Sequence, residues 1–495
     1  MLLPVDVLTR ALRREYAGLL PLLSDSGTQA SSAVAVANAI DLLAQRAGRG
    51  AKGLADQAAA LRKAAVRMAA ALGQGEGSVA LAGIADDLAR FDPANLEQAE
   101  IHLRDAMRSF ETIIAREAAR APAALVSGEA AVALADWEAA TLLADLPSSD
   151  ENSASAFAIT RDRLEAYLRD RFGEADMALT EFRPLPGGFG KETILFSVAG
   201  EALSGDFVMR RDPGDNQSLA NDCHEVAREY PVIHAAFERG FPAPDALWLD
   251  TEHALLPGGH FIVMRKSPGE LGGDFFGAAR QVAPELSDAL AGIAAKLHTL
   301  EPLLELGDLA SFIKPELWEL SRGEAARRYI AGWRDYYLAE SHTPSPALLA
   351  IYGWLLENVP DRPQPASLIH GDVGFNNFLF ENGQLTAVLD WEFAHIGDPA
   401  EELGYIAVTT GASLDWERFI ASYVAAGGDP VDDETLHYFK VWAYARNASA
   451  SNILWTRFAD GLIGDLKVSI LPYHHYPHFI QGAAQLIAQT RKAAG

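Results

Sequence analysis

The residues most able to do chemistry lie in one segment, 368–398, which reads LIHGDVGFNNFLFENGQLTAVLDWEFAHIGD. An H-G-D triplet ends at Asp372, Asn377 follows five residues later, and Asp390 closes an apolar run. A carboxylate such as Asp372 can orient a hydroxyl nucleophile and accept its proton, as phosphoryl transfer requires. Mg²⁺ prefers hard oxygen ligands, which Asn377 and Asp390 can supply, with Glu392 as a further candidate. The segment therefore predicts phosphoryl transfer assisted by Mg²⁺.

Each of these residues taken alone would be more typical of an ordinary loop, because Asp and Asn commonly cap helices or form Asx turns. The complete pattern is far more specific. It joins H-G-D-x4-N to a turn at Asn382-Gly383 and an apolar strand that ends in D-W-E. A hairpin built on that turn would bring Asp390 back beside Asn377.

This pattern resembles the aminoglycoside phosphotransferase and choline kinase family, which are small-molecule kinases with the protein-kinase fold. The resemblance is carried by His370–Asn377, Leu389–Glu392 and Gly397–Pro399 and covers roughly residues 175–490. It implies that Asp372 is the catalytic base, that Asn377 and Asp390 bind Mg²⁺, and that the phosphoryl donor is ATP.

The family template also assigns a nucleotide side to the chain. The segment 186–193 lies between an extended segment and a strand and contains Gly187, Gly188 and Gly190. It would form a turn that covers the ATP phosphates, although a plain hairpin turn would explain it too. Arg210 stands where kinases usually have a lysine that contacts the phosphates, and Glu229 would be its ion-pair partner.

An arginine keeps the charge of that lysine but is longer and planar, so the exchange alters the contact. The neighbouring Arg211 is the alternative phosphate contact. Met264 would lie on the strand that leads into the hinge, where backbone groups meet adenine.

Several elements must position these residues. Strand-like runs occur at 193–198, 205–210 and 259–264, a helical run occurs at 225–239, and helices dominate from about residue 274. Two short strand-like pieces, 378–380 and 385–390, interrupt those helices. We therefore expect an α+β fold, a two-lobed protein-kinase-like domain preceded by an all-α helical bundle.

The first 150 residues are rich in alanine and leucine, with apolar residues at helical spacing and breaks at 48–53, 73–77, Pro93 and Pro122. The 48–53 stretch matches GxGxxG but follows a helical run, so we expect a loop between helices there. The predicted division is a helical accessory domain at 1–150, a kinase N-lobe with its linker at 151–266, and a helical C-lobe at 267–495. The accessory domain would close over the acceptor pocket or form a homodimer.

The 495-residue chain is 49% hydrophobic and carries a formal charge of −26, so it has ample residues for several cores. Such acidity argues against broad nucleic-acid binding. No apolar run is long enough to span a membrane, and the first residues do not resemble a secretory signal. A single cysteine, Cys223, fits a reducing cytosol. We expect a cytoplasmic protein.

Other candidates carry weaker signals. His474, His475 and His478 could suggest a metal, but Pro477 is expected to break any helix between them. Another histidine, His298, is expected to be a packed structural residue. Two acids after the metal strand have structural expectations: Asp398 would hold the catalytic loop, and Glu402 stands where relatives often have Asp.

The acceptor is the least determined feature. Residues 226–230, 263–264 and 387–392 resemble the branch of the family found fused to, or beside, acyl-CoA dehydrogenases, which implies a hydroxyacid, a hydroxyacyl-CoA or an alcohol as acceptor. About −21 of the net charge lies beyond residue 150, and such acidity suits a cationic aminoglycoside better than a CoA ester. A nucleotide-binding regulatory pseudokinase is the third alternative, favoured slightly by Arg210 and by the unusual Gly190-Lys191 pair.

Overall fold

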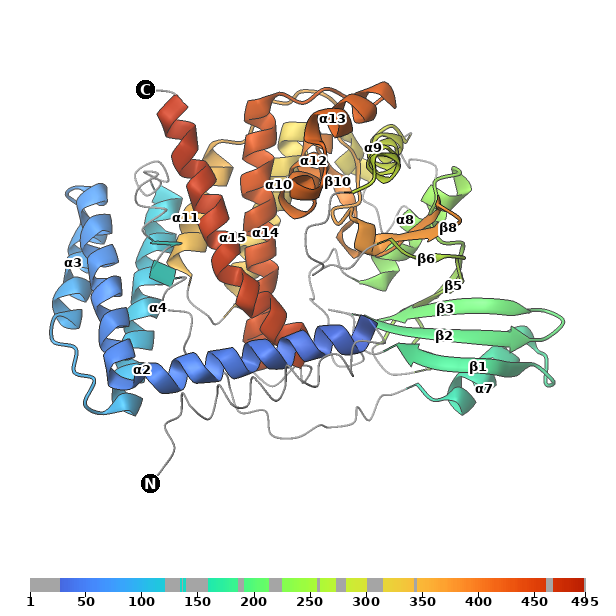
Figure 1. Cartoon of the computed structure of the whole chain (residues 1–495), viewed down its shortest axis with the longest axis horizontal. Helices are drawn as coiled ribbons and strands as arrows, with labels where there is room; N and C mark the ends of the chain where they lie inside the picture. Colours follow the sequence, from blue (N-terminus) through green and yellow to red (C-terminus); the bar gives the residue numbers. More distant parts are fainter. Residues whose placement is uncertain are drawn as a thin grey trace. The chain divides into compact units, whose positions relative to one another are not determined.

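The computed structural model describes residues 27–120, 134–135, 137–138, 159–185, 191–212, 225–255, 259–272, 282–300, 315–341, 345–459 and 466–493 (Figure 1). The chain divides into two compact units. We call residues 1–149, 327–359 and 440–495 the helical unit, and residues 150–326 and 360–439 the sheet unit. The helical unit thus includes two segments that we had placed in the C-lobe. The three-part functional division stays a prediction.

Long helices build the helical unit. α2 (Gly27–Leu72) packs against α3 (Glu76–Leu88), α4 (Leu96–Arg120) and α15 (Leu466–Ala493), while α11 (Pro346–Glu357) packs against α4 and α15. The larger parts of α10 (Arg322–Glu340) and α14 (Asp433–Ala459) also belong to this unit.

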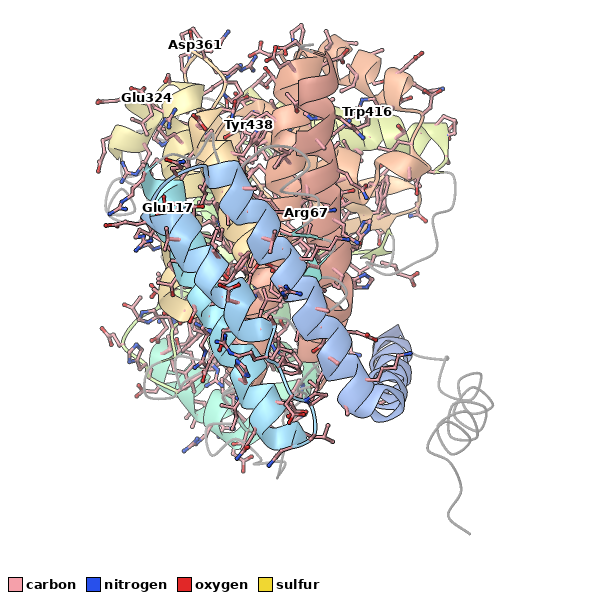
Figure 2. The ribbon with its side chains drawn as sticks, turned by 90° about the vertical axis from the view of Figure 1, so that its left-hand side faces the viewer. Arg67, Glu117, Glu324, Asp361, Trp416 and Tyr438 are labelled. Carbon is pink, nitrogen blue, oxygen red and sulfur yellow. The ribbon has the colours of Figure 1, made fainter. Side chains whose placement is uncertain are left out.

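The contact between α3 and α4 depends on a small residue. Gly77 lies in the first turn of α3, and a Cβ there would lie 2.5 Å from the side chain of Glu117 on α4, a residue labelled in Figure 2. A larger residue at position 77 would therefore require the flexible side chain of Glu117 to move aside.

Two of the predicted breaks coincide with the ends of helices, since α2 ends before the 73–77 stretch and α4 begins after Pro93. The 48–53 stretch is a kink at Gly50 (φ 48°) with helix on both sides, and Pro122 lies outside the described residues. The break expected at Pro477 is wrong, because α15 runs through it. Buried Tyr476 and Ile480 anchor the helix on both sides of that proline, and this packing offsets the lost hydrogen bond.

One antiparallel sheet organises the first half of the sheet unit, in the strand order β1-β2-β3-β5-β4. The strands are β1 (Ala178–Leu185), β2 (Glu192–Ala199), β3 (Gly205–Arg211), β4 (Ala246–Asp250) and β5 (Phe261–Arg265). β2, β3 and β5 confirm the three predicted strand-like runs. The sequence reading named no strand at β4 and only an extended segment before residue 186, where β1 lies.

Helices cover this sheet on both faces. Apolar side chains such as Phe207 and Phe261 form one buried cluster with Leu164 of α7 (Arg161–Phe172). The opposite face, with Ile262, packs against α8 (Val226–Glu238), the predicted helix. Because side chains alternate along a strand, residue 210 of β3 shares the α8 face with residue 208.

The second half of the sheet unit is largely helical, with α9 (Pro284–His298), α12 (Pro399–Thr409) and α13 (Trp416–Ala425). Two small sheets lie among these helices. β7 (Ser367–Ile369) pairs with β10 (His395–Gly397), and β6 (Glu270–Leu271), β8 (Phe378–Glu381) and β9 (Gln384–Val388) form the order β6-β8-β9. Across the described parts of the chain, no helix combines the length and apolar character that crossing a membrane requires.

Candidate phosphotransferase site

The backbone of the H-G-D triplet is held by a buried glutamate. Glu402 of α12 accepts hydrogen bonds from the backbone N–H groups of His370 (3.2 Å) and Gly371 (2.9 Å). Burial alone would raise the pKa of Glu402, but the hydrogen bond from His298 and these further contacts hold that pKa below its ordinary value. Glu402 therefore stays ionised as the anchor of the loop. His298, which also contacts Tyr423, is the packed residue expected.

Asp398 has a different role from the one expected. Its carboxylate pairs with Arg362 at 2.9 and 3.2 Å and caps α12 by accepting from the backbone N–H of Ala400. The hydrogen bonds from the backbone of the H-G-D triplet go to Glu402 instead.

Both carboxylate oxygens of Asp372 have partners. The amide Nδ2 of Asn377 donates to Oδ2 of Asp372 at 2.8 Å and to its backbone carbonyl at 2.9 Å. The hydroxyl of Tyr405, on α12, donates to the other oxygen, Oδ1. The side chain of Asp372 is half-buried. These contacts fix the direction in which its carboxylate points.

The hairpin brings the two halves of the motif together as predicted. Asn382 (φ 52°) and Gly383 (φ 77°) form its turn, and the backbone N–H of Leu389 donates to the carbonyl of Asn377 at 2.7 Å. His370 adds a second link, since its Nε2 lies 3.0 Å from the carbonyl of Leu389. Asp390 follows with φ 65° and ψ 66°, a left-handed conformation that few non-glycine residues adopt.

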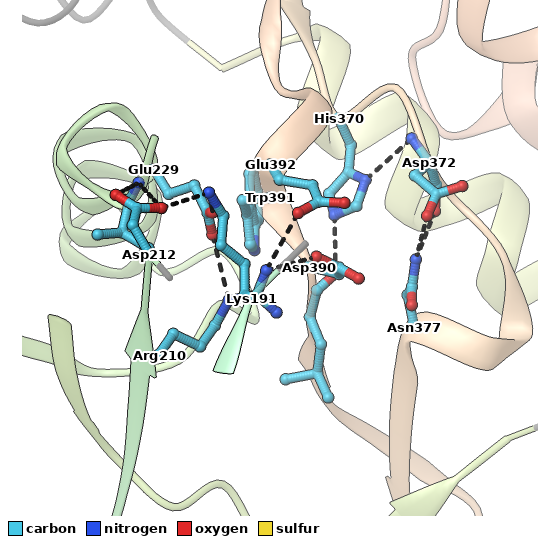
Figure 3. A network of polar contacts seen from close by, with 12 residues as sticks. Lys191, Arg210, Asp212, Glu229, His370, Asp372, Asn377, Asp390, Trp391 and Glu392 are labelled. Carbon is cyan, nitrogen blue, oxygen red and sulfur yellow. Dashed lines mark hydrogen bonds and ion pairs between the residues drawn. The ribbon is translucent and has the colours of Figure 1, made fainter. Parts of the chain in front are cut away.

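A cluster of charges, which we call the charged cluster, joins this motif to the large sheet (Figure 3). The guanidinium of Arg210 lies 2.8 Å from Asp390, 3.6 Å from Glu392 and 3.4 Å from Glu229. The ammonium of Lys191 lies 2.6 Å from Asp212 and 3.9 Å from Glu229. The four carboxylates outnumber the two cations by two.

The pKa values in the cluster reflect this excess of negative charge. Burial would lower the pKa of Arg210, but Asp390, Glu229 and Glu392 outweigh it and keep the pKa well above its ordinary value. Burial raises the pKa of Glu229, which the charges of Arg210 and Lys191 offset only in part. Burial and the charge of Asp390 raise the pKa of Glu392 to about 8.

Residues 181–439 of this chain match the APH phosphotransferase enzyme family. The chain belongs to this family. Among curated proteins, the acyl-CoA dehydrogenase family member 11 of Gallus gallus is 28% identical over 327 residues, which cover 60% of this chain and 40% of the relative. Hygromycin-B 4-O-kinase of Escherichia coli is 34% identical over 86 residues, which cover 15% of this chain and 25% of that kinase.

The matched part covers 40% or less of the first curated relatives. Among solved structures, a Ralstonia eutropha protein assigned to the aminoglycoside phosphotransferases has a TM-score of 0.50 and 18% identity, covering 67% of this chain and 99% of that one. This likeness confirms the kinase-like fold that the family resemblance implied.

The APH family implies a nucleotide-bound metal, and the donor set here fits Mg²⁺. Asp390 and Glu392 offer hard oxygens, and their repulsion, seen in the raised pKa of Glu392, is of the kind a cation relieves. Because Nδ2 of Asn377 binds Asp372, the amide oxygen is left for other partners. Within the described residues, no three His, Cys, Asp or Glu side chains form a metal site by themselves, so the amide and the phosphates would have to complete it.

The geometry distinguishes the two candidate arginines. Arg211 is fully buried and forms an ion pair with Glu192, the residue opposite it on the neighbouring strand β2. Arg210 faces Glu229, the partner expected of a phosphate-binding cation in this position. Of the two arginines, Arg210 is therefore the better candidate for the phosphate contact predicted from the sequence.

Some predicted site residues stay untested. Gly187, Gly188 and Gly190 lie outside the described residues. Met264 lies within β5, where its backbone is in register with Val208 and its side chain is buried, so its contact with adenine remains a prediction.

The sequence predicted no ion-pair or binding role for Lys191, noting it only as unusual, and gave no indication of Tyr405. The position of Lys191, directly after the glycine-rich turn, was the available signal for it. The position of Tyr405 in the sequence carried no such signal.

Proposed function

We propose that this protein is an ATP- and Mg²⁺-dependent small-molecule kinase that transfers the γ-phosphoryl group to a substrate hydroxyl. The observation that carries the proposal is the preorganised carboxylate of Asp372, held by Asn377 and Tyr405 within the segment that also presents Asp390. Membership of the APH family supports the same reaction class.

The proposed reaction transfers one phosphoryl group from ATP to the acceptor hydroxyl. The acceptor oxygen attacks the γ-phosphorus, a new P–O bond forms, and the bond between the γ-phosphorus and its bridging oxygen breaks to release ADP. The proton of the acceptor hydroxyl passes to Asp372. Mg²⁺, when held by Asn377, Asp390 and Glu392, would neutralise charge on the phosphates. A cation of the charged cluster would supply positive charge beside them, and Arg210, paired with Glu229, is the one that the sequence predicts.

For the acceptor, we propose a hydroxyacid, a hydroxyacyl-CoA or an alcohol. The similarity to acyl-CoA dehydrogenase family member 11 supports this class, because such a dehydrogenase acts on acyl-CoA chains. Phosphorylation of an unactivated hydroxyl turns it into a good leaving group, which is useful in the breakdown of hydroxylated acids.

An aminoglycoside is the second candidate acceptor. The similarity to hygromycin-B 4-O-kinase and the acidity of the chain both favour it, since aminoglycosides are cations. A screen separates the two classes. The full-length protein is incubated with γ-labelled ATP, Mg²⁺ and panels of hydroxyacids, their CoA esters, alcohols and aminoglycosides, and labelled products are identified by mass spectrometry. Label on aminoglycosides alone would contradict the hydroxyacyl proposal, and label on no panel would contradict the kinase proposal.

We further propose that the protein works in the cytoplasm and that its N-terminal helices close over the acceptor or form a homodimer. The low cysteine content supports a cytoplasmic location. The role of the N-terminal helices is tested by sedimentation of the intact protein with and without acceptor.

A further inference from the structure

Lys191 is the least expected member of the charged cluster. Its side chain is 3% exposed, and it enters the cluster from the residue directly before β2 and not from β3. Its ammonium lies 2.6 Å from Asp212 and 3.9 Å from Glu229. A lysine is almost never buried without a reason, because its charge must be compensated.

The two cations of the cluster face different carboxylates. Arg210 makes its short contact, at 2.8 Å, with Asp390 and lies 3.6 Å from Glu392, the two carboxylates on the metal side. Lys191 makes no such contact with those two, and its short contact is with Asp212. Glu229 is the one carboxylate that both cations approach.

Asp212 ties Lys191 to the helix that carries Glu229. Its carboxylate oxygens lie 3.3 and 3.2 Å from the backbone N–H of Val226, at the first residue of α8. The ammonium of Lys191 is therefore held at the start of α8. In the sequence, Lys191 directly follows the glycine-rich segment that the family template places over the phosphates. An ammonium on a flexible stem can exchange a carboxylate for a phosphate with little rearrangement.

Glu229 is held by ion pairs alone. Both of its oxygens are buried and make ion-pair contacts, yet neither accepts a hydrogen bond of good geometry. A buried carboxylate in this state is costly unless a cation approaches it more closely. A closer approach of Lys191, which lies 3.9 Å from Glu229, would provide such a cation.

From these contacts we propose that Lys191, directly before β2, takes the place of the predicted Arg210 as the cation that binds the nucleotide phosphates, while Arg210 serves the carboxylates of the metal side. This inference rests on the proposed kinase function. It moves the phosphate-binding cation expected at position 210 of β3 to the residue directly before β2 and leaves the paired glutamate, Glu229, in place.

The alternative is that Lys191 is only a structural counter-ion of Asp212. Binding of ADP and of adenosine to the intact protein, measured by calorimetry, separates the two, because adenosine has no phosphates. For Lys191→Met we expect the affinity for ADP to fall about tenfold or more and the affinity for adenosine to stay unchanged. The exposed lysine of α9 provides the matched control, Lys296→Met, which should bind both ligands as the wild type does.

The double variant Lys191→Met/Asp212→Asn guards against misfolding, because it leaves no unpaired charge at Asp212. It should show the same selective loss for ADP. Equal ADP affinity in the wild type and in both Lys191 variants would overturn the assignment of Lys191. A wild type that binds ADP no better than adenosine would instead contradict the kinase function itself.

Discussion

At the residue scale, the candidate base is distinguished by how completely it is oriented. Asn377 and Tyr405 each hold one oxygen of the Asp372 carboxylate, so the carboxylate cannot rotate without losing a hydrogen bond. A base held this way meets an incoming hydroxyl in one geometry, and such positioning accounts for much of the rate in phosphoryl transfer.

Removal of the Tyr405 hydroxyl tests this positioning. In Tyr405→Phe we expect kcat to fall about tenfold while the KM for ATP stays near the wild-type value, because the phenol orients the base and does not bind the nucleotide. Steady-state kinetics with the acceptor found in the screen gives both constants. Tyr444→Phe in the helical unit is the matched control, and an unchanged kcat in Tyr405→Phe would refute the positioning role.

The sequence was sufficient for residues that share one local motif. Asp372, Asn377 and Asp390 were predicted together because their spacing is set by one loop and one hairpin. Tyr405 was not, because it lies 33 residues from Asp372 and reaches it only through the packing of α12. The pair of Lys191 and Asp212 was not predicted either, because its members lie 21 residues apart and meet only through the fold.

At the element scale, the β8–β9 hairpin determines whether the site forms. Its turn needs positive φ at both Asn382 and Gly383, which suits an Asn-Gly pair. The hairpin then places Asp390 in a left-handed conformation that costs roughly 1 kcal/mol or more and that the surrounding contacts must maintain.

Replacement of the turn glycine tests this dependence. Gly383 has φ 77°, so Gly383→Ala should lower the free energy of unfolding by about 1 kcal/mol and reduce activity. The helical Gly292→Ala, whose Cβ would meet no atom within 4 Å, should be neutral or slightly stabilising. Urea denaturation gives both values. Equal stability of Gly383→Ala and Gly292→Ala would show that the turn does not constrain the hairpin.

Elements with strong local patterns were predictable, and others were not. The apolar runs of β2, β3 and β5 marked them as strands. β1 lacks such a signal, because most of its residues are exposed and its pairing with β2 shifts register between Leu179 and Glu181. The path of α15 through Pro477 depends on packing that a local helix-breaking rule ignores.

At the scale of the whole molecule, the helical unit is assembled from distant parts of the chain. Glu138 accepts hydrogen bonds from Ser345 (2.8 Å) and from the backbone N–H of Ala347 (2.6 Å), while Tyr476 donates to it at 3.2 Å. The helical unit therefore does not end near residue 150, because it also includes segments 327–359 and 440–495. Composition and helical periodicity could not reveal this, because an apolar helix face does not specify its partner.

This buried network predicts a pH-dependent stability. Burial raises the pKa of Glu138 to about 8, and the nearby charge of Glu111 adds to the effect. The folded state then binds more protons than the unfolded state between pH 4.5 and 8, so stability is full at low pH and falls as the pH rises through this range.

The variant Glu138→Gln should remove this dependence, because a neutral amide keeps a donor and an acceptor in the network. Wild-type stability should fall by at most about 1.4 kcal/mol per pH unit in this range, and that slope should flatten in the variant. Chemical denaturation at several pH values measures it. Glu111 faces the same site and burial raises its pKa too, so a slope unaltered by Glu138→Gln would assign the titration to Glu111 or to another part of the molecule.

The central claim is that Asp372 is the base of a phosphoryl transfer, and one comparison tests it most directly. The full-length wild type and Asp372→Asn are assayed side by side for transfer of labelled phosphate from ATP, with Mg²⁺, to the panel of hydroxylated acceptors, and the exposed Asp361→Asn serves as control. We expect wild type and Asp361→Asn to transfer phosphate equally and Asp372→Asn to be slower by about 100-fold or more. Equal rates in wild type and Asp372→Asn would contradict the account.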